Sequence, residues 1–137
     1  MIGLDTNVLV RYTVQDDYTV QDDTEQSAAA TSIVESLSEE SPGFVSVVVI
    51  VELTWVLRRA YRSPDSVIAA VVRTLLDATE IVVQDSDAVR RALDRTAGGQ
   101  EFPDALIAEL GFLAGCSHTV TFDRAAAKLP YLQLIDS

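Results

Sequence analysis

The order of apolar and polar positions along the chain predicts alternating strands and helices. A short apolar run at residues 2–5 ends in Asp5, and a brief helix is expected from Thr6 to Arg11. Other short apolar runs predict a buried strand at 44–47 and further strands at 80–83, 117–122 and 131–135. Apolar residues spaced by three and four predict helices at 25–39, 48–61, 64–78, 85–96, 103–114 and 123–128. This alternation predicts an α/β fold with a mostly parallel central sheet that helices cover on both faces.

Length and composition are those of an ordinary globular domain. The chain has 137 residues, of which 48% are apolar and 23% are charged, so we expect a single domain over 1–137. No apolar run approaches the roughly 18 residues of a membrane helix, and the N-terminus carries no basic or leader-like segment. One cysteine allows no internal disulfide and no zinc cluster. We therefore expect a cytoplasmic protein without membrane contact.

The net charge of −11 argues, taken alone, against a nucleic-acid partner, because a surface of that sign repels phosphate. One interpretation is an acidic surface that suits salt or a basic partner. The other is that some carboxylates bind a divalent metal, which would reverse the local field. The positions of the carboxylates along the chain distinguish an acidic surface from a metal site.

Four carboxylates stand where sites occur in parallel α/β folds, at strand ends and at the starts of helices. Asp5 and Asp123 end predicted strands, and Asp104 lies at a helix start; each of them could simply cap a helix or complement its dipole. Glu52 lies inside the run VSVVVIVELTWVL and is expected to be buried, which requires a metal or an arginine partner. Glu109 is excluded because it lies five residues, about 140°, around the helix from Asp104.

If the sheet is parallel, these four acids could converge at one edge. Carboxylates gathered there repel one another unless a cation is present. Hard oxygen ligands without histidine or cysteine suit Mg²⁺ or Mn²⁺, and such an ion can activate water for attack on a phosphate. The chain has no glycine-rich phosphate loop and no serine elbow, so metal-dependent chemistry is the catalytic hypothesis.

The chain resembles PIN-domain proteins, and among them the VapC-type toxins of type II toxin–antitoxin systems. The matching segments are MIGLDTNVLVRY, SVVVIVELTWVLRRAY, FPDALIAELGFLAGC and TFDRAAAKLP, in the order of the family. The resemblance implies a PIN-like α/β/α sandwich and RNA cleavage that depends on Mg²⁺ or Mn²⁺. It also implies a homodimer and inhibition by a VapB-type antitoxin, with DNA contacted only through that antitoxin.

The resemblance also assigns site residues. It places Asp5, Glu52, Asp104 and Asp123 in the acidic site as catalytic and metal-binding residues. Thr6 and Asn7 match the positions after the first acid, and we expect them to orient ligands or substrate. Further candidates around the site are Ser46 and, for phosphate contacts, Arg11 and Arg124, whose alternative is a solvated surface.

The chain departs from the family in one segment. The sequence YTVQDD occurs twice in tandem, at residues 12–17 and 18–23, which indicates a duplication within a loop. Its aspartates are interpreted as solvated loop residues rather than metal ligands. The duplication adds two negative charges close to where RNA or an antitoxin would approach.

The sequence is compatible with three functions. The leading hypothesis is a metal-dependent endoribonuclease toxin. The second is a catalytically silent module that binds metal or an antitoxin arginine and acts in transcriptional autoregulation. A receiver domain is the weakest, because Asp5 is followed by Thr6 and Asn7 rather than by a second acid, and Lys128 lies within a predicted helix.

Overall fold

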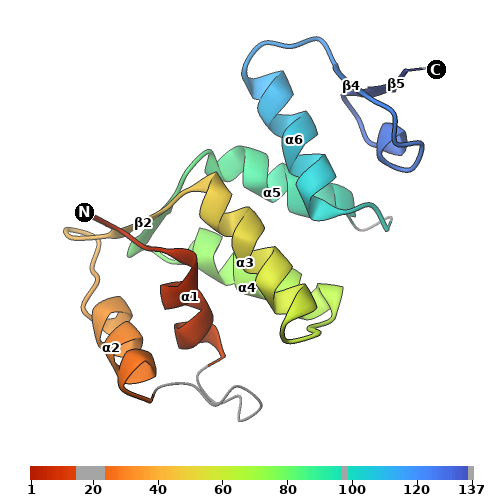
Figure 1. Ribbon diagram of the computed structural model, residues 1–137. Coiled ribbons are helices and arrows are strands. Elements are labelled where there is room, and N and C mark those ends of the chain that lie inside the picture. Colours follow the sequence, from red (N-terminus) through yellow and green to blue (C-terminus); the bar gives the residue numbers. More distant parts are fainter. Residues whose placement is uncertain (15–23, 97–98, 136–137) are drawn as a thin grey trace. The chain divides into compact units, whose positions relative to one another are not determined.

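The structure is a computed structural model that describes residues 1–14, 24–96 and 99–135 (Figure 1). The chain divides into two compact units, Met1–Gln84 and Asp85–Ser137. Every strand pairing in both units is parallel among the described residues. The described part is therefore a mixed α/β structure of helices and parallel strands, as the sequence predicts.

The first unit is built on a three-stranded sheet of order β1-β2-β3. The strands are β1 (Ile2–Gly3), β2 (Gly43–Val45) and β3 (Ile81–Val83). Backbone hydrogen bonds extend the pairing past the carboxyl ends of β1 and β3: Leu4 donates to the Phe44 carbonyl at 2.9 Å, and Gln84 donates to the Val45 carbonyl at 2.9 Å. Parallel pairing brings the carboxyl ends of these strands to one edge, where the chain enters α1 (Thr6–Thr13) and α3 (Val47–Arg59).

The helices of the first unit bury the apolar face of this sheet. Helix α1 packs against α2 (Thr24–Glu35) and against α3, and α3 also packs against α4 (Asp65–Asp77). The side chains at the centre are fully or almost fully buried: Leu9, Val45, Ile50, Leu53, Leu57 and Val72. Burying an aliphatic side chain of this size contributes about 1.5–3 kcal/mol, so this cluster holds the α1–α3 junction in place.

The second unit pairs two helices with a two-stranded sheet. Helix α5 (Ser86–Arg95) packs against α6 (Phe102–Leu113), and the strands are β4 (Thr119–Thr121) and β5 (Leu132–Leu134), with the short helix η2 (Ala126–Lys128) between them. Small residues allow close packing: Gly111 of α6 approaches Thr119 so closely that an added Cβ would lie 2.5 Å from its hydroxyl oxygen.

The predicted elements are found with shifted ends. Helix α2 ends at Glu35 instead of residue 39, and the last helical turn before β5 covers three residues. The five strands form two sheets, one in each unit, where the sequence predicted one central sheet. The predicted Asp23 cap and residues 15–23 of the duplicated segment lie outside the described residues. In the described part of the chain, no helix has the length and apolarity needed to cross a membrane.

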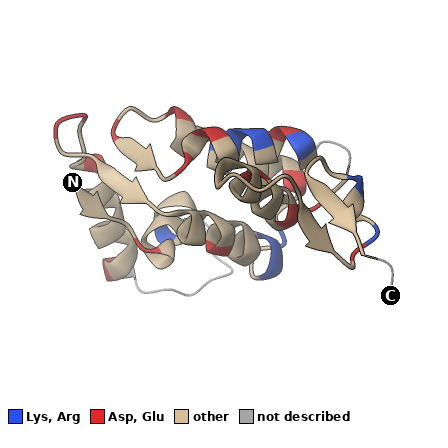
Figure 2. Ribbon diagram, turned by 90° about the horizontal axis from the view of Figure 1, so that it is seen from above, with Lys and Arg blue, Asp and Glu red and all other residues tan. Residues whose placement is uncertain are grey.

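Acidic side chains outnumber basic ones along the ribbon (Figure 2). Red positions occur on helices and on loops, and the blue positions are fewer. The overall charge of −11 therefore conceals local differences, which matter more for a polyanionic ligand than the total does.

Candidate functional site

Asp5 is held at the start of α1, directly after the first strand. It is the N-cap residue of that helix, and its Oδ1 accepts a hydrogen bond of 2.7 Å from the Thr6 backbone amide. The side chain is exposed. Asp5 is thus a helix cap, which was the structural alternative considered for it, and its carboxylate is at the same time fixed in place and open to solvent.

Glu52 is the second acid of the first unit, and its environment differs from the prediction. The side chain is exposed rather than buried, and its partner is the Thr6 hydroxyl, which donates to Oε1 at 2.8 Å, rather than an arginine. The expectation of burial was wrong because the apolar run around Glu52 shows no polar stripe. Position 52 faces outward, while Ile50, Leu53 and Leu57 fill the core.

Thr6 therefore connects the two acids of the first unit. Its backbone amide binds Asp5, its hydroxyl binds Glu52, and its side chain is only 9% exposed. A buried β-branched residue has few rotamers, so the hydroxyl is well placed to fix the Glu52 carboxylate. The structure brings Asp5, Thr6 and Glu52 together at the carboxyl end of the first strand.

The start of α3 is capped twice. The Ser46 hydroxyl accepts from the Val49 amide at 3.2 Å, and Gln84 Oε1 accepts from the Val47 amide at 3.0 Å. Ser46 was a predicted site residue; its observed contact is this local cap. Sequence reasoning missed Gln84, although it follows β3 as Asp5 follows the first strand, which was the available signal. Together the two caps fix the helix that carries Glu52.

In the second unit, Asp104 and Asp123 influence each other. Asp104 lies in the first turn of α6 and is partly buried. Burial raises the pKa of Asp104, and the negative charges of Asp123 and then Glu101 raise it further. The charge of Asp123 therefore acts on the Asp104 carboxylate within this unit. Glu101 is an additional acid that the sequence reading did not select.

Asp123 is also a local cap. Its Oδ1 accepts from the amides of Ala125 and Ala126, at 2.9 and 3.0 Å, and its own amide donates to the Thr121 hydroxyl at 3.0 Å. The side chain is exposed. Among the described residues, the hydrogen bonds of Asp5 and of Asp123 all go to Oδ1, which leaves Oδ2 of each for a ligand.

Glu109 has the burial and the arginine partners that were one of the two alternatives considered for Glu52. It is fully buried on α6 and accepts from Arg91 Nε at 2.7 Å and from Arg95 Nε at 2.9 Å. Both arginines lie on α5, so this network joins the two helices. The exclusion of Glu109 from the site agrees with this role, because both carboxylate oxygens are bound by cations.

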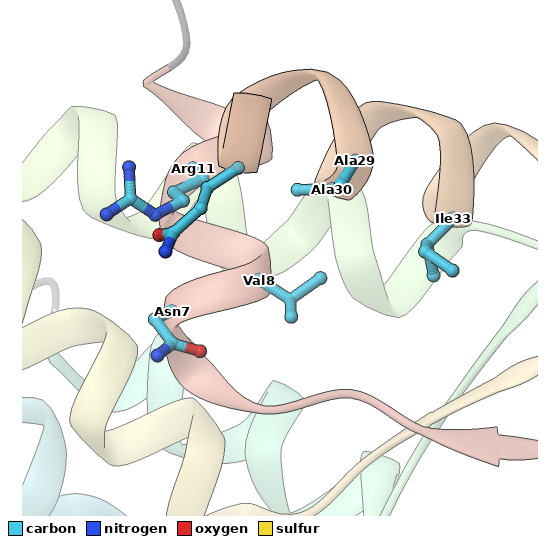
Figure 3. Close-up of a pocket in the computed structure, with 7 residues that line it drawn as sticks. Asn7, Val8, Arg11, Ala29, Ala30 and Ile33 are labelled. Carbon is cyan, nitrogen blue, oxygen red and sulfur yellow. The ribbon is translucent and has the colours of Figure 1, made fainter. Parts of the chain in front are cut away.

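Of the remaining predicted residues, Asn7 and Arg124 are exposed, and Arg11 is half-buried. Asn7 and Arg11 of α1 line a cavity of about 300 Å³ together with Val8 and, from α2, Gln26, Ala29, Ala30 and Ile33 (Figure 3). The polar side chains of Asn7 and Arg11 come from one helix, and the apolar ones come mainly from the other. Arg124 follows Asp123 and is exposed.

The four predicted acids are thus divided between the units: Asp5 and Glu52 lie in the first, and Asp104 and Asp123 lie in the second. Within the described residues of either unit, three or more acidic, histidine or cysteine side chains do not form a metal-binding group. The donors suit a hard divalent cation such as Mg²⁺ or Mn²⁺, because all of them are carboxylate oxygens. The pKa of Asp104 is raised first by burial and then by the negative charges of Asp123 and Glu101, and a cation would relieve the second cause.

Comparison with known proteins agrees with this chemistry. The family model of the PIN domain matches residues 2–131, which is nearly the whole chain. A search of curated proteins found no match. PIN domains are typically nucleases that use divalent metals, so the match supports a nuclease, that is, a hydrolase of phosphodiester bonds.

Proposed function

Because the chain belongs to the PIN-domain family, we propose that it is a metal-dependent endoribonuclease toxin of a toxin–antitoxin pair. The observation that carries the proposal is the arrangement of Asp5, Thr6 and Glu52. Two exposed carboxylates are held by hydrogen bonds of 2.7 and 2.8 Å to one buried threonine. Acids placed only for solubility need no such support, whereas a metal ligand does.

We propose that Asp5, Glu52 and Asp104 hold Mg²⁺ or Mn²⁺, with Asp123 assisting or holding a second ion. A divalent cation bound there supplies a water of lowered pKa and neutralises charge on the phosphate. Thr6 orients the Glu52 carboxylate, and the helix-cap bonds hold Asp5 and Asp123 with Oδ2 available. Asp104 must lose its proton to bind a cation, and its raised pKa makes that loss harder.

The expected reaction is hydrolysis of the P–O3′ bond of RNA. The water oxygen bonds to phosphorus, and O3′ leaves with a proton. The products then carry a 5′-phosphate and a 3′-hydroxyl, because the 2′-hydroxyl takes no part. Asn7, Arg11 and Arg124 are proposed to contact the substrate, the arginines through phosphate oxygens.

The proposed partners are a VapB-type antitoxin and a second copy of this chain. An acidic site that binds a metal also accepts a guanidinium, so an antitoxin arginine could inhibit by occupying it. The second candidate function uses the same surface without turnover: a silent module that binds metal or antitoxin and contributes to transcriptional autoregulation. Cleavage in the presence of metal distinguishes the two.

The test is cleavage of total cellular RNA by the purified, antitoxin-free chain with Mg²⁺ or Mn²⁺, compared with chelator. Asp5→Asn should abolish cleavage and leave the fold intact, because asparagine caps a helix as well as aspartate does. Asp65→Asn is the matched control, since Asp65 is an exposed acid of the same unit that pairs with Arg58. Discrete fragments from the wild type and the control, and none from Asp5→Asn, would support the nuclease.

Activity retained by Asp5→Asn would refute the assignment of the site. If the folded wild type gives no fragments, the deletion of residues 18–23 removes one copy of YTVQDD. Cleavage by the deletion variant would show that the duplication silences an enzyme, and continued inactivity would favour the binding module.

A further inference from the structure

Helix α3 exposes a row of four side chains that includes Glu52. Val48, Glu52, Trp55 and Arg59 are spaced by four, three and four residues, which places them within about 60° on one face of a helix. Val48 is 65% exposed and Trp55 is 54% exposed. Trp55 lies about 4.5 Å further along the helix axis than Glu52. An exposed indole one turn from a candidate catalytic acid has no role in the core.

Arg59 covers part of this indole. Its guanidinium carbon lies 4.0 Å from the centroid of the Trp55 ring. A cation–π contact at an exposed site contributes about 0.5–1 kcal/mol, which is too little to explain why the largest apolar side chain type is left in water. The pair nevertheless places a planar cation over an exposed aromatic ring.

We propose that Trp55 and Arg59 form a stacking platform for a base of single-stranded RNA next to the scissile phosphate. The inference rests on the proposed ribonuclease function and adds a substrate-positioning subsite to it. Bases that are not paired in a helix stack on aromatic side chains and on guanidinium planes. Val48 and Trp55 flank Glu52 on the same face, so a strand that follows α3 would pass the acid.

Charge favours RNA over a protein as the occupant. The chain has ten lysines and arginines, and three of them, Arg58, Arg59 and Arg62, fall within five residues at and just after the end of α3. Arg58 is paired with Asp65 at 2.7 Å, whereas Arg59 lies on the aromatic ring. Cations beside an aromatic ring are the combination that binds single strands, the ring taking the base and the cation the phosphate. Arg59 thus offers a positive charge directly at the exposed ring of Trp55, on a chain whose net charge is −11.

Trp55 is the only tryptophan of the chain, so its fluorescence reports directly on the platform. The test uses the full-length Asp5→Asn protein with Mg²⁺ and short single-stranded oligoribonucleotides. A stacked base should quench the indole emission in a saturable manner, and double-stranded RNA of the same sequence should quench it far less. Binding without a change in Trp55 emission would overturn the proposal.

Variants of the active protein separate positioning from structure. Trp55→Ala should raise KM about 5- to 150-fold with kcat nearly unchanged, and Trp55→Phe should restore most of the loss. Arg59→Ala should lower the slope of log binding constant against log salt by about 0.7, the value for one phosphate contact on a single strand. Val67→Ala is the matched control, because Val67 is an exposed apolar residue of α4 in the same unit. All variants should keep the wild-type melting temperature within a few degrees.

The outcomes distinguish this inference from the proposed function. Metal-dependent cleavage with an unchanged KM in Trp55→Ala would refute the platform and leave the nuclease standing. Quenching by RNA without any cleavage would support the platform and refute the enzyme. Loss of antitoxin-peptide binding in Trp55→Ala, with RNA binding unchanged, would assign this face to a protein partner and overturn the proposal.

Discussion

Removing the Thr6 hydroxyl tests whether its hydrogen bond orients the Glu52 carboxylate for a metal ion. Thr6→Val keeps the β-branched shape and the backbone amide that binds Asp5, and it removes only the 2.8 Å hydrogen bond to Glu52. Because the Thr6 side chain is almost completely buried, water cannot take the place of its hydroxyl. The Glu52 carboxylate is exposed and would be rehydrated, but it would no longer have a fixed orientation.

Two magnitudes follow from this geometry. The stability cost is about 1 kcal/mol, a typical net hydrogen bond, since the carboxylate regains water. The cost for the metal is larger, because losing a group that orients a ligand typically lowers metal affinity or activity by about 10- to 100-fold. We therefore expect the metal concentration for half-maximal cleavage to rise by about that factor, with a melting temperature only about 3–5 °C lower.

The assay is RNA cleavage at a series of Mn²⁺ concentrations, together with calorimetric titration of Mn²⁺ into the free protein. Thr54→Val is the matched control: Thr54 is buried on α3 and donates to the Val51 carbonyl at 2.8 Å, without contact to an acid. It should leave metal affinity unchanged. Equal metal affinities in Thr6→Val and the wild type, or equal losses in both variants, would refute the reasoning.

Three further predictions concern stability and pH. Glu109→Ala should lower the free energy of unfolding in urea by about 2 kcal/mol, because it removes charge-assisted hydrogen bonds from Arg91 and Arg95, whose partly exposed side chains regain water. Asp65→Ala, which breaks an exposed pair, should cost less than about 1 kcal/mol. Ser46→Ala should cost about 1 kcal/mol through loss of the α3 cap, measured in the same way. The pKa of Asp104 in the folded state is raised above 3.8, so the folded protein loses stability as the pH rises from 3.8 through the raised pKa and Asp104 ionises. Asp104→Asn should therefore raise the melting temperature of the metal-free protein at about pH 7. Binding of Mn²⁺ to the metal-free protein should accordingly weaken on acidification at a higher pH than an ordinary aspartate would give, and a Mn²⁺ affinity without this pH dependence would contradict the assignment.

Local features of the fold were predictable from sequence because their causes lie within a few residues. Asp5 caps α1 through the very next amide, and Asp123 caps its turn through amides two and three residues on. Such bonds depend on side-chain chemistry and short spacing alone. The parallel strands and the acids at their ends followed from the same kind of pattern.

The environment of each acid needed the tertiary structure. The sequence reading placed Glu52 in the core because every residue around it is apolar, and it gave no burial to Glu109. The structure reverses both: Glu52 is exposed beside Thr6, 46 residues away, and Glu109 is buried against two arginines 14 and 18 residues away. An all-apolar helix has no sequence period that identifies its outward face, so its packing neighbours decide.

The sequence by itself therefore determined the element order, the local caps and the four acids that suit a metal nuclease. These properties arise from short-range hydrogen bonding and from the kinds of atoms that the side chains carry. Only the tertiary structure decided which acids are paired, which one is buried with arginines, and that Trp55 and Arg59 share an exposed face with Glu52. Those properties depend on which face of each helix is packed into the core. The burial of apolar surface by segments distant in the sequence determines that face.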